Sequence, residues 1–466
     1  MRAALAATLM LVLAGCAASG SRTVRPLEVA AVRSGDSWTA EFHFPRRAGA
    51  WVFVRSALAR IGEQPWRPRS WTVETPGVRL ERQGHYDVLV AARGRRVPDR
   101  VRVRFTPFTG DLIADYDPAL AFTDGSVALF SGQFEAFPLD SAAAAGRLPI
   151  DLSGAGAPAS PTRVTFSDAT GQVLHAGQRY QAVVLDQASG SYVLFGPAQP
   201  IVTDQLSTII DPQLPRWIAD SLARAAPDIL ARYAAAMGPA PGPRPTIMVS
   251  WAGPTPRLRS MGGSTLPGLI AITYEGAGVL SENAELRAFG LKFIAHEAAH
   301  FWLGETVCYQ YSRDAWITEG GADLLAIRTV AALDPAYDWR AELDRSIADC
   351  ATLSSGRGIA SAEQRNEHRA YYACGALFGL LAEAASGRPF TQFVRGLIAA
   401  NRADTVVTRE EWLAALDQVS GDRALSDGIA ALLDQGSPQP KAAIGALLAR
   451  AGIAFAPGED GMPGLR

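Results

Sequence analysis

Short segments in which apolar and polar residues alternate occupy the chain from about Val24 to Gly196. Period-two alternation is typical of strands that bury one face and expose the other. Turn residues separate the segments, and this spacing predicts an antiparallel β-sandwich. The strand-like segments are residues 38–44, 51–58, 101–105, 127–134, 162–166 and 192–195.

After about Asp211 the apolar residues recur at helical spacing instead. A first helix is predicted over residues 214–237, where Gly238 and Pro239 end it. Two strand-like segments follow, at 246–251 and 268–274, and the rest is mostly helical to about Gly452. The expected fold class is α+β, with an N-terminal antiparallel β-sandwich and then a mixed α/β and mainly helical domain.

The bulk composition is that of a globular protein of two or three domains. The 466 residues are 48% hydrophobic and 19% charged, with a formal net charge of -2. The chain has no long run of Lys or Arg, and nucleic-acid binding needs a basic surface. We therefore expect no nucleic-acid partner.

The first twenty residues carry a positive charge at Arg2 and then an apolar stretch too short to span a bilayer. The motif Leu13-Ala14-Gly15-Cys16 resembles the bacterial lipoprotein box, which implies cleavage before Cys16 and lipidation of that cysteine. Ala17 in the next position favours the outer membrane by the same resemblance, with the protein facing the periplasm or the cell surface. The alternative is a plain secretory signal that happens to contain a cysteine.

The predicted organisation follows from these patterns. The expected parts are a signal peptide (1–15), a lipidated tether (16–23), an N-terminal β-sandwich domain (24–205), a second domain (206–455) and a tail (456–466). Three further cysteines remain in an oxidising compartment, and Cys350 and Cys374 are the preferred disulfide pair because they flank a loop-like stretch.

The candidate chemistry lies in the segment 284–304. Phe289, Phe293, His296 and His300 follow one another at spacings of four, three and four, which places them on one side of a helix. Two imidazoles one turn apart can bind the same ion, and Glu297 can then reach a water molecule at that ion. A buried helix with two hydrogen-bonded histidines would show the same motif.

A third ligand strengthens the metal-site interpretation. Eighteen residues separate His300 from Glu319, which precedes an apolar helical run. A catalytic zinc site takes three protein ligands and keeps one position open. His296, His300 and Glu319 therefore form a candidate ligand set.

These residues and their neighbours resemble the signature of the aminopeptidase N family and the related glycyl aminopeptidases. The matching positions are His296, Glu297, Ala299, His300, Trp302 and Gly304, then Trp316, Ile317, Glu319, Gly320 and Ala322. The resemblance implies a thermolysin-like peptidase domain of the gluzincin type with one Zn2+. It also implies that Glu297 is the general base.

Two further matches extend the resemblance. Tyr372, in Tyr-Ala-Cys-Gly, is similar to the family's oxyanion-stabilising tyrosine, with Tyr371 as the fallback and a helix-packing aromatic as the alternative. Asp323 lies one turn beyond Glu319, as in the Glu-x-x-x-Asp element of thermolysin-like enzymes, where the aspartate orients a ligand histidine. The alternative for Asp323 is a solvated helix residue.

One departure from the family pattern affects specificity. The family's Gly-Ala-Met-Glu-Asn strand corresponds here to residues 262–266, and Thr265 replaces the glutamate that holds the free ammonium group of the substrate. A neutral hydroxyl cannot supply that charge-assisted bond. We still expect Gly262, Gly263 and Thr265 to bind peptide through the strand backbone.

The expected function is zinc-dependent hydrolysis of peptide bonds, in peptide or protein substrates, by a metallopeptidase tethered to the membrane through its lipid. An endopeptidase or an atypical exopeptidase is the alternative to a true aminopeptidase because of Thr265. A non-catalytic binding lipoprotein on a peptidase fold is the alternative from another class.

Overall fold

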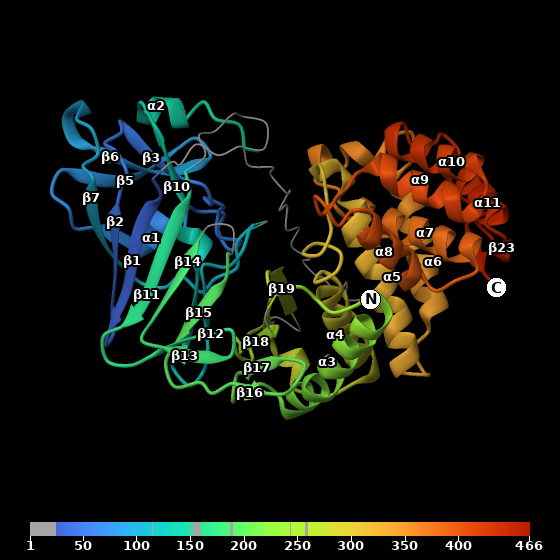
Figure 1. The fold of residues 1–466 in the computed structure, drawn as a ribbon, viewed down its shortest axis with the longest axis horizontal. Coiled ribbons are helices and arrows are strands. Elements are labelled where there is room, and N and C mark those ends of the chain that lie inside the picture. The colour runs from blue at the N-terminus through green and yellow to red at the C-terminus, as the bar shows by residue number, and fades with distance from the viewer. Residues whose placement is uncertain are drawn as a thin grey trace. The chain divides into compact units, whose positions relative to one another are not determined.

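The chain forms two compact units in a computed structural model (Figure 1). The structure describes residues 25–113, 115–150, 152, 160–186, 190–242, 244–256 and 260–466. The N-terminal unit holds the described residues up to 216 and from 244 to 280, and the helical unit holds 217–242 and 281–466. The predicted signal peptide and lipidation site at Cys16 lie outside the described residues.

Three sheets build most of the N-terminal unit. Apart from the parallel pair of β1 and β11, all strand pairs in these sheets are antiparallel. The six-stranded sheet has the order β14 (Ala182–Asp186), β11 (Thr162–Asp168), β1 (Leu27–Ser34), β2 (Ser37–His43), β7 (Arg100–Phe105) and β4 (Trp71–Val73). The four-stranded sheet has the order β10 (Ala136–Leu139), β3 (Ala50–Phe53), β6 (Tyr86–Ala91) and β5 (Val78–Gln83). The five-stranded sheet has the order β13 (Gln178–Tyr180), β12 (Val173–His175), β15 (Tyr192–Phe195), β9 (Val127–Phe130) and β8 (Ala119–Ala121).

The alternation seen in the sequence explains how these sheets pack. Along β7, exposed arginines alternate with buried Val101, Val103 and Phe105. One hydrophobic core contains these residues together with Phe53 of the four-stranded sheet and Phe195 of the five-stranded sheet. The predicted β-sandwich is confirmed, and two one-turn helices, α1 (Arg67–Ser70) and α2 (Ala142–Ala145), interrupt it.

A fourth sheet of five strands belongs to the same unit. Its order is β16 (Ile201–Val202), β17 (Ser207–Ile210), β18 (Thr246–Trp251), β20 (Leu269–Glu275) and β19 (Ser260–Leu266). Strands β17, β18 and β20 are parallel, whereas β19 runs antiparallel to β20 and is the last strand of the sheet.

Helices dominate the second unit. They are α3 (Arg216–Met237), α4 (Ala284–Ala299), α5 (Trp316–Leu333), α6 (Trp339–Leu353), α7 (Arg369–Ser386), α8 (Phe390–Ala400), α9 (Arg409–Ser420), α10 (Arg423–Asp434) and α11 (Pro440–Arg450). Two small two-stranded sheets join β21 (Cys308–Tyr309) to β22 (Val406–Val407) and β23 (Phe455–Pro457) to β24 (Pro463–Leu465).

Local sequence signals set the ends of the helices around the candidate site. The side chain of Asn283 accepts a hydrogen bond from the Leu286 amide and so begins α4. His300 is the C-cap residue of α4 and keeps helical backbone angles, so the predicted spacing from His296 holds at the helix end. A capping box of Thr408 and Glu411 begins α9.

The α+β fold class is confirmed by these elements. The disulfide between Cys350 of α6 and Cys374 of α7 is also confirmed. The predicted domain bounds, including the boundary between 205 and 206, stay a prediction. Among the described residues, no helix is both long and apolar enough to cross a membrane.

Candidate metal centre

Two helices bring the three predicted ligands together. Nε2 of His296 on α4 lies 3.1 Å from Nε2 of His300 at its end. A carboxylate oxygen of Glu319, in the first turn of α5, lies 3.4 Å from each of these nitrogens. The side chains of His296 and Glu319 are buried, and that of His300 is 14% exposed.

Two hydrogen bonds orient the imidazoles so that both Nε2 atoms face the cluster. Nδ1 of His296 lies 3.0 Å from an oxygen of Asp323, and Nδ1 of His300 lies 2.9 Å from the carbonyl oxygen of Leu303. A carbonyl oxygen only accepts, so Nδ1 of His300 carries the proton and donates. The Nε2 atoms can then direct their lone pairs at a common point.

The cluster fits a zinc ion in size and chemistry. Tetrahedral zinc with bonds of about 2.0–2.1 Å separates its ligand atoms by about 3.3–3.4 Å. The separations of 3.1, 3.4 and 3.4 Å in the structure are close to that value. Two nitrogen lone pairs and a carboxylate oxygen repel one another at these distances unless a cation or protons lie between them.

The carboxylates and imidazoles of the cluster shift one another's pKa values, as expected for groups of opposite charge that face one another. Burial lowers the pKa of His296, but the carboxylates of Asp323 and Glu319 outweigh burial and raise it to about 10. Burial would raise the pKa of Glu319, yet His300 and His296 lower it to about 2. In the metal-free protein His296 therefore keeps both of its ring protons at neutral pH, and a divalent cation must displace the one on Nε2.

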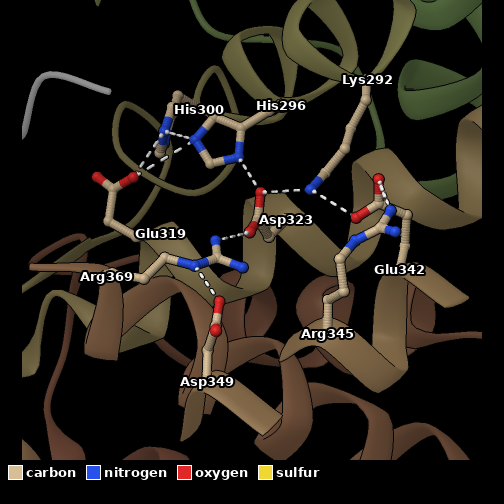
Figure 2. A network of polar contacts seen from close by, with 9 residues as sticks. All are labelled: Lys292, His296, His300, Glu319, Asp323, Glu342, Arg345, Asp349 and Arg369. Atoms are coloured by element: carbon tan, nitrogen blue, oxygen red, sulfur yellow. Dashed lines mark hydrogen bonds and ion pairs between the residues drawn. The ribbon is translucent and has the colours of Figure 1, made fainter. Parts of the chain in front are cut away.

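Asp323 belongs to a network of charged side chains behind His296 (Figure 2). Its Oδ1 atom faces His296 and also lies 3.7 Å from Nζ of Lys292 on α4. Its Oδ2 atom accepts a hydrogen bond of 3.4 Å from Arg369 at the start of α7. The structure thus places Asp323 against His296, a candidate ligand, as the resemblance to the Glu-x-x-x-Asp element implies.

Tyr372 lies beside the ligands. Its ring stacks on that of His296, with 5.7 Å between ring centroids and 28° between planes. The hydroxyl is buried and has no hydrogen-bond partner among the described residues. Burial raises the pKa of Tyr372 well above its ordinary value and Glu319 adds to the effect, so the hydroxyl stays protonated and can donate. By contrast, the hydroxyl of Tyr371 accepts a hydrogen bond from the Glu363 amide.

Glu297 follows His296 on α4 and is 5% exposed. Its charge contributes to the raised pKa of both His296 and His300. The metal cluster therefore has a buried carboxylate and a buried phenol within its immediate surroundings.

The predicted peptide-binding strand is β19, in the N-terminal unit. Thr265 is 7% exposed, pairs with Ile270 of β20, and its carbonyl oxygen accepts a hydrogen bond from the hydroxyl of Tyr116. Gly262 and Gly263 lie on the same strand. These residues and the ligand cluster belong to different compact units, so peptide binding by this strand stays a prediction.

Sequence reasoning did not find Lys292, Arg369 or the carbonyl of Leu303. Lys292 is one turn before His296, and this i, i+4 spacing was a signal that could have been used. Arg369 and Leu303 depend on how the chain folds around the site, so no local pattern indicates them. His368 lies at the N-cap of α7, and its buried Nδ1 has no hydrogen-bond partner among the described residues.

The fold is similar to that of an aminopeptidase N family protein and of an LTA4 hydrolase, both of known structure. An aminopeptidase N family protein from Idiomarina loihiensis matches with a TM-score of 0.59 and 12% identity, over 94% of this chain and 81% of that chain. Native LTA4 hydrolase from yeast matches with a TM-score of 0.51 and 12% identity, over 88% of this chain and 68% of that chain.

No protein-family model and no curated protein matches the chain. The chain has an aminopeptidase N-like fold. At 12% identity, the likeness to these structures is one of fold alone.

Proposed function

We propose that this protein is a zinc-dependent metallopeptidase that hydrolyses peptide bonds and is tethered to the bacterial cell envelope. The observation that carries the proposal is the triangle of His296 Nε2, His300 Nε2 and a Glu319 oxygen, with sides of 3.1, 3.4 and 3.4 Å. The aminopeptidase N-like fold supports it, because the cluster lies on the helices that carry the family-like motifs in the sequence.

The residues of this chain take three roles in the proposed reaction: they bind the metal, transfer a proton and stabilise the oxyanion. His296, His300 and Glu319 would hold one zinc ion. When bound, zinc supplies positive charge that polarises the scissile carbonyl group and makes a water molecule more acidic. Glu297 would take a proton from the attacking water and pass it to the leaving amine.

Tyr372 would stabilise the charge that develops on the carbonyl oxygen. Its buried hydroxyl has no other hydrogen-bond partner among the described residues, and its raised pKa keeps the proton available for donation. A donor already in place for the developing charge needs no reorganisation during the reaction.

Thr265 favours an endopeptidase or an atypical exopeptidase over a true aminopeptidase. A glutamate at this position would attract a free ammonium group, and the hydroxyl of threonine carries no charge to do so. Among the described residues, β19 is the last strand of its sheet, and extended peptides add to sheets at such outer strands.

The cell-envelope assignment rests on the sequence alone. The lipoprotein-like motif ending at Cys16 would give an outer-membrane anchor, with the folded units in the periplasm or at the surface. Labelling with a radioactive fatty acid, with Cys16→Ser as the control, tests it: an unlabelled parent protein rules out the anchor.

Digestion of a mixed peptide library tests the catalytic proposal. We expect the zinc-loaded protein to cleave peptides and Glu297→Gln to retain zinc while losing several orders of magnitude in turnover, as read by mass spectrometry of the fragments. A zinc-loaded parent that cleaves nothing would indicate a binding protein on a peptidase fold. Equal cleavage by Glu297→Gln would remove Glu297 from its role.

A further inference from the structure

Asp323 is held from two sides by cations that come from different helices (Figure 2). Lys292 of α4 lies 3.7 Å from the Oδ1 atom, the same oxygen that faces His296. Arg369 of α7 bonds to the Oδ2 atom at 3.4 Å. Because each oxygen has a different cationic partner, rotation of the carboxylate would weaken at least one of these contacts.

Each cation is itself held by an outer carboxylate. Arg369 directs Nε at Asp349 of α6, at 2.8 Å, and so spans two carboxylates with one guanidinium group. Lys292 lies 3.7 Å from Glu342 of α6. The outer carboxylates therefore help to direct both cations towards Asp323. The side chain of Asp323 is only 5% exposed.

Arg369 also stands one turn before Tyr372 on α7. Its contact with Asp323 joins the start of the helix that carries the proposed oxyanion donor to the residue that orients His296. One side chain thus connects two parts of the site that lie on different helices.

We propose that Arg369 and Lys292 are positioning residues for the metal: they hold Asp323 in the orientation in which it accepts the Nδ1 proton of His296. The proposal rests on the proposed zinc site. It gives these two cations a role in metal affinity, since partners behind a ligand histidine set its direction and its strength as a donor.

A purely structural role is the competing explanation, because the same ion pairs join α4, α5, α6 and α7. The chain offers a matched control for it. Arg328 of α5 forms an ion pair with Glu383 of α7 and is 30% exposed, so it also joins α5 to α7. In the described part of the chain, Arg328 pairs with Glu383 and lies over the ring of Trp339, and it makes no polar contact with the residues of the candidate site.

The experiment measures zinc affinity by competition with a chelator, together with thermal unfolding, in the full chain. We expect Arg369→Met and Lys292→Met each to raise the zinc dissociation constant roughly 10–100-fold. Arg328→Met should lower the melting temperature and leave the dissociation constant within about twofold. Arg369→Lys should restore part of the affinity, because it keeps the charge but cannot reach both carboxylates.

A second readout follows the geometry of the ligands directly. With Co2+ in place of zinc, the visible absorption bands should change in Arg369→Met and stay unchanged in Arg328→Met, since the bands report the coordination geometry. An unaltered spectrum in Arg369→Met would contradict the proposal even if its stability falls.

Each outcome decides the proposal. Unchanged zinc affinity in Arg369→Met overturns the role of that residue, and equal loss in Arg328→Met shows a structural role only. Should Arg369→Met fail to fold, Lys292→Met is judged by the same criteria. A zinc-binding parent that cleaves no peptide overturns the proposed function but leaves this inference standing, and a parent that binds no zinc overturns both.

Discussion

Gly320 of α5 lies directly against Gly375 of α7. A Cβ atom added to Gly320 would lie 2.2 Å from the Cα atom of Gly375, and one added to Gly375 would lie 2.2 Å from the carbonyl oxygen of Trp316. Only glycine permits this approach of two helix backbones. The contact brings the helix that carries Glu319 against the helix that carries Tyr372.

Gly375→Ala should therefore damage both stability and the site. We expect it to lower the free energy of unfolding by roughly 1–3 kcal/mol or more, because the added methyl group meets backbone atoms that cannot move independently. Gly396→Ala is the matched control, since an added Cβ there meets nothing within 4 Å on the exposed face of α8. It should stabilise the helix by roughly 0.5–1 kcal/mol. Chemical denaturation compares the two, and a harmless Gly375→Ala would refute the close approach.

Tyr372→Phe should reduce catalysis without loss of zinc. Removal of one oxyanion donor costs roughly 2–4 kcal/mol of transition-state stabilisation, which should appear in kcat rather than in metal content. Tyr371→Phe is the control, because its hydroxyl is occupied by the Glu363 amide. If Tyr371→Phe proves the slower enzyme, the oxyanion role belongs to Tyr371.

Zinc binding should release protons and tighten as pH rises. Asp323 and Glu319 raise the pKa of His296 to about 10 in the metal-free protein, so zinc must displace a proton at neutral pH. Affinity should rise up to about tenfold per pH unit for each proton displaced. Calorimetric titration in buffers of different ionisation enthalpy counts these protons, and a count of zero contradicts the assignment.

The same pKa shifts predict the stability of the metal-free protein. A raised pKa at His296 stabilises the folded state fully below about pH 6.5, and this contribution is lost as pH rises towards 10. A lowered pKa at Glu319 stabilises above about pH 4.5 and is lost as pH falls towards 2. Denaturation of the metal-free protein across pH should show lower stability on both sides of this window. In Glu319→Gln the loss on the acid side should be smaller but still present, because the pKa of Asp323 is lowered as well.

Substrate choice should depend little on a free N-terminus. Because Thr265 is neutral, we expect one peptide sequence with a free and with an acetylated N-terminus to be hydrolysed at rates within about tenfold of each other. Liquid chromatography of the products measures both. Strict dependence on the free amine would instead establish an aminopeptidase with another residue as its amine-binding group.

The metal cluster was predictable because its signals are local or regularly spaced. His296 and His300 share one helix, and Asp323 follows Glu319 by one helical turn, so each pair is fixed by helix geometry. The interval between His300 and Glu319 resembles that of the family, and it was enough to predict that Glu319 would face the two histidines.

Other features depend on contacts between distant parts of the chain. Arg369 and Asp323 lie on α7 and α5, two helices that also approach at Gly320 and Gly375, and no pattern near residue 369 indicates their contact. The short strands β4, β12 and β13 have three residues each, too few to show an alternation. The parallel pairing of β1 with β11 joins segments more than a hundred residues apart in the sequence, and the sequence of neither strand indicates its partner.

Zinc stoichiometry in single-ligand variants tests the central claim most directly. Elemental analysis of the dialysed protein should find one zinc per chain in the parent and in Glu297→Gln. It should find little or none in His296→Ala, His300→Ala and Glu319→Ala. Full zinc content in any of these three ligand variants would contradict the account.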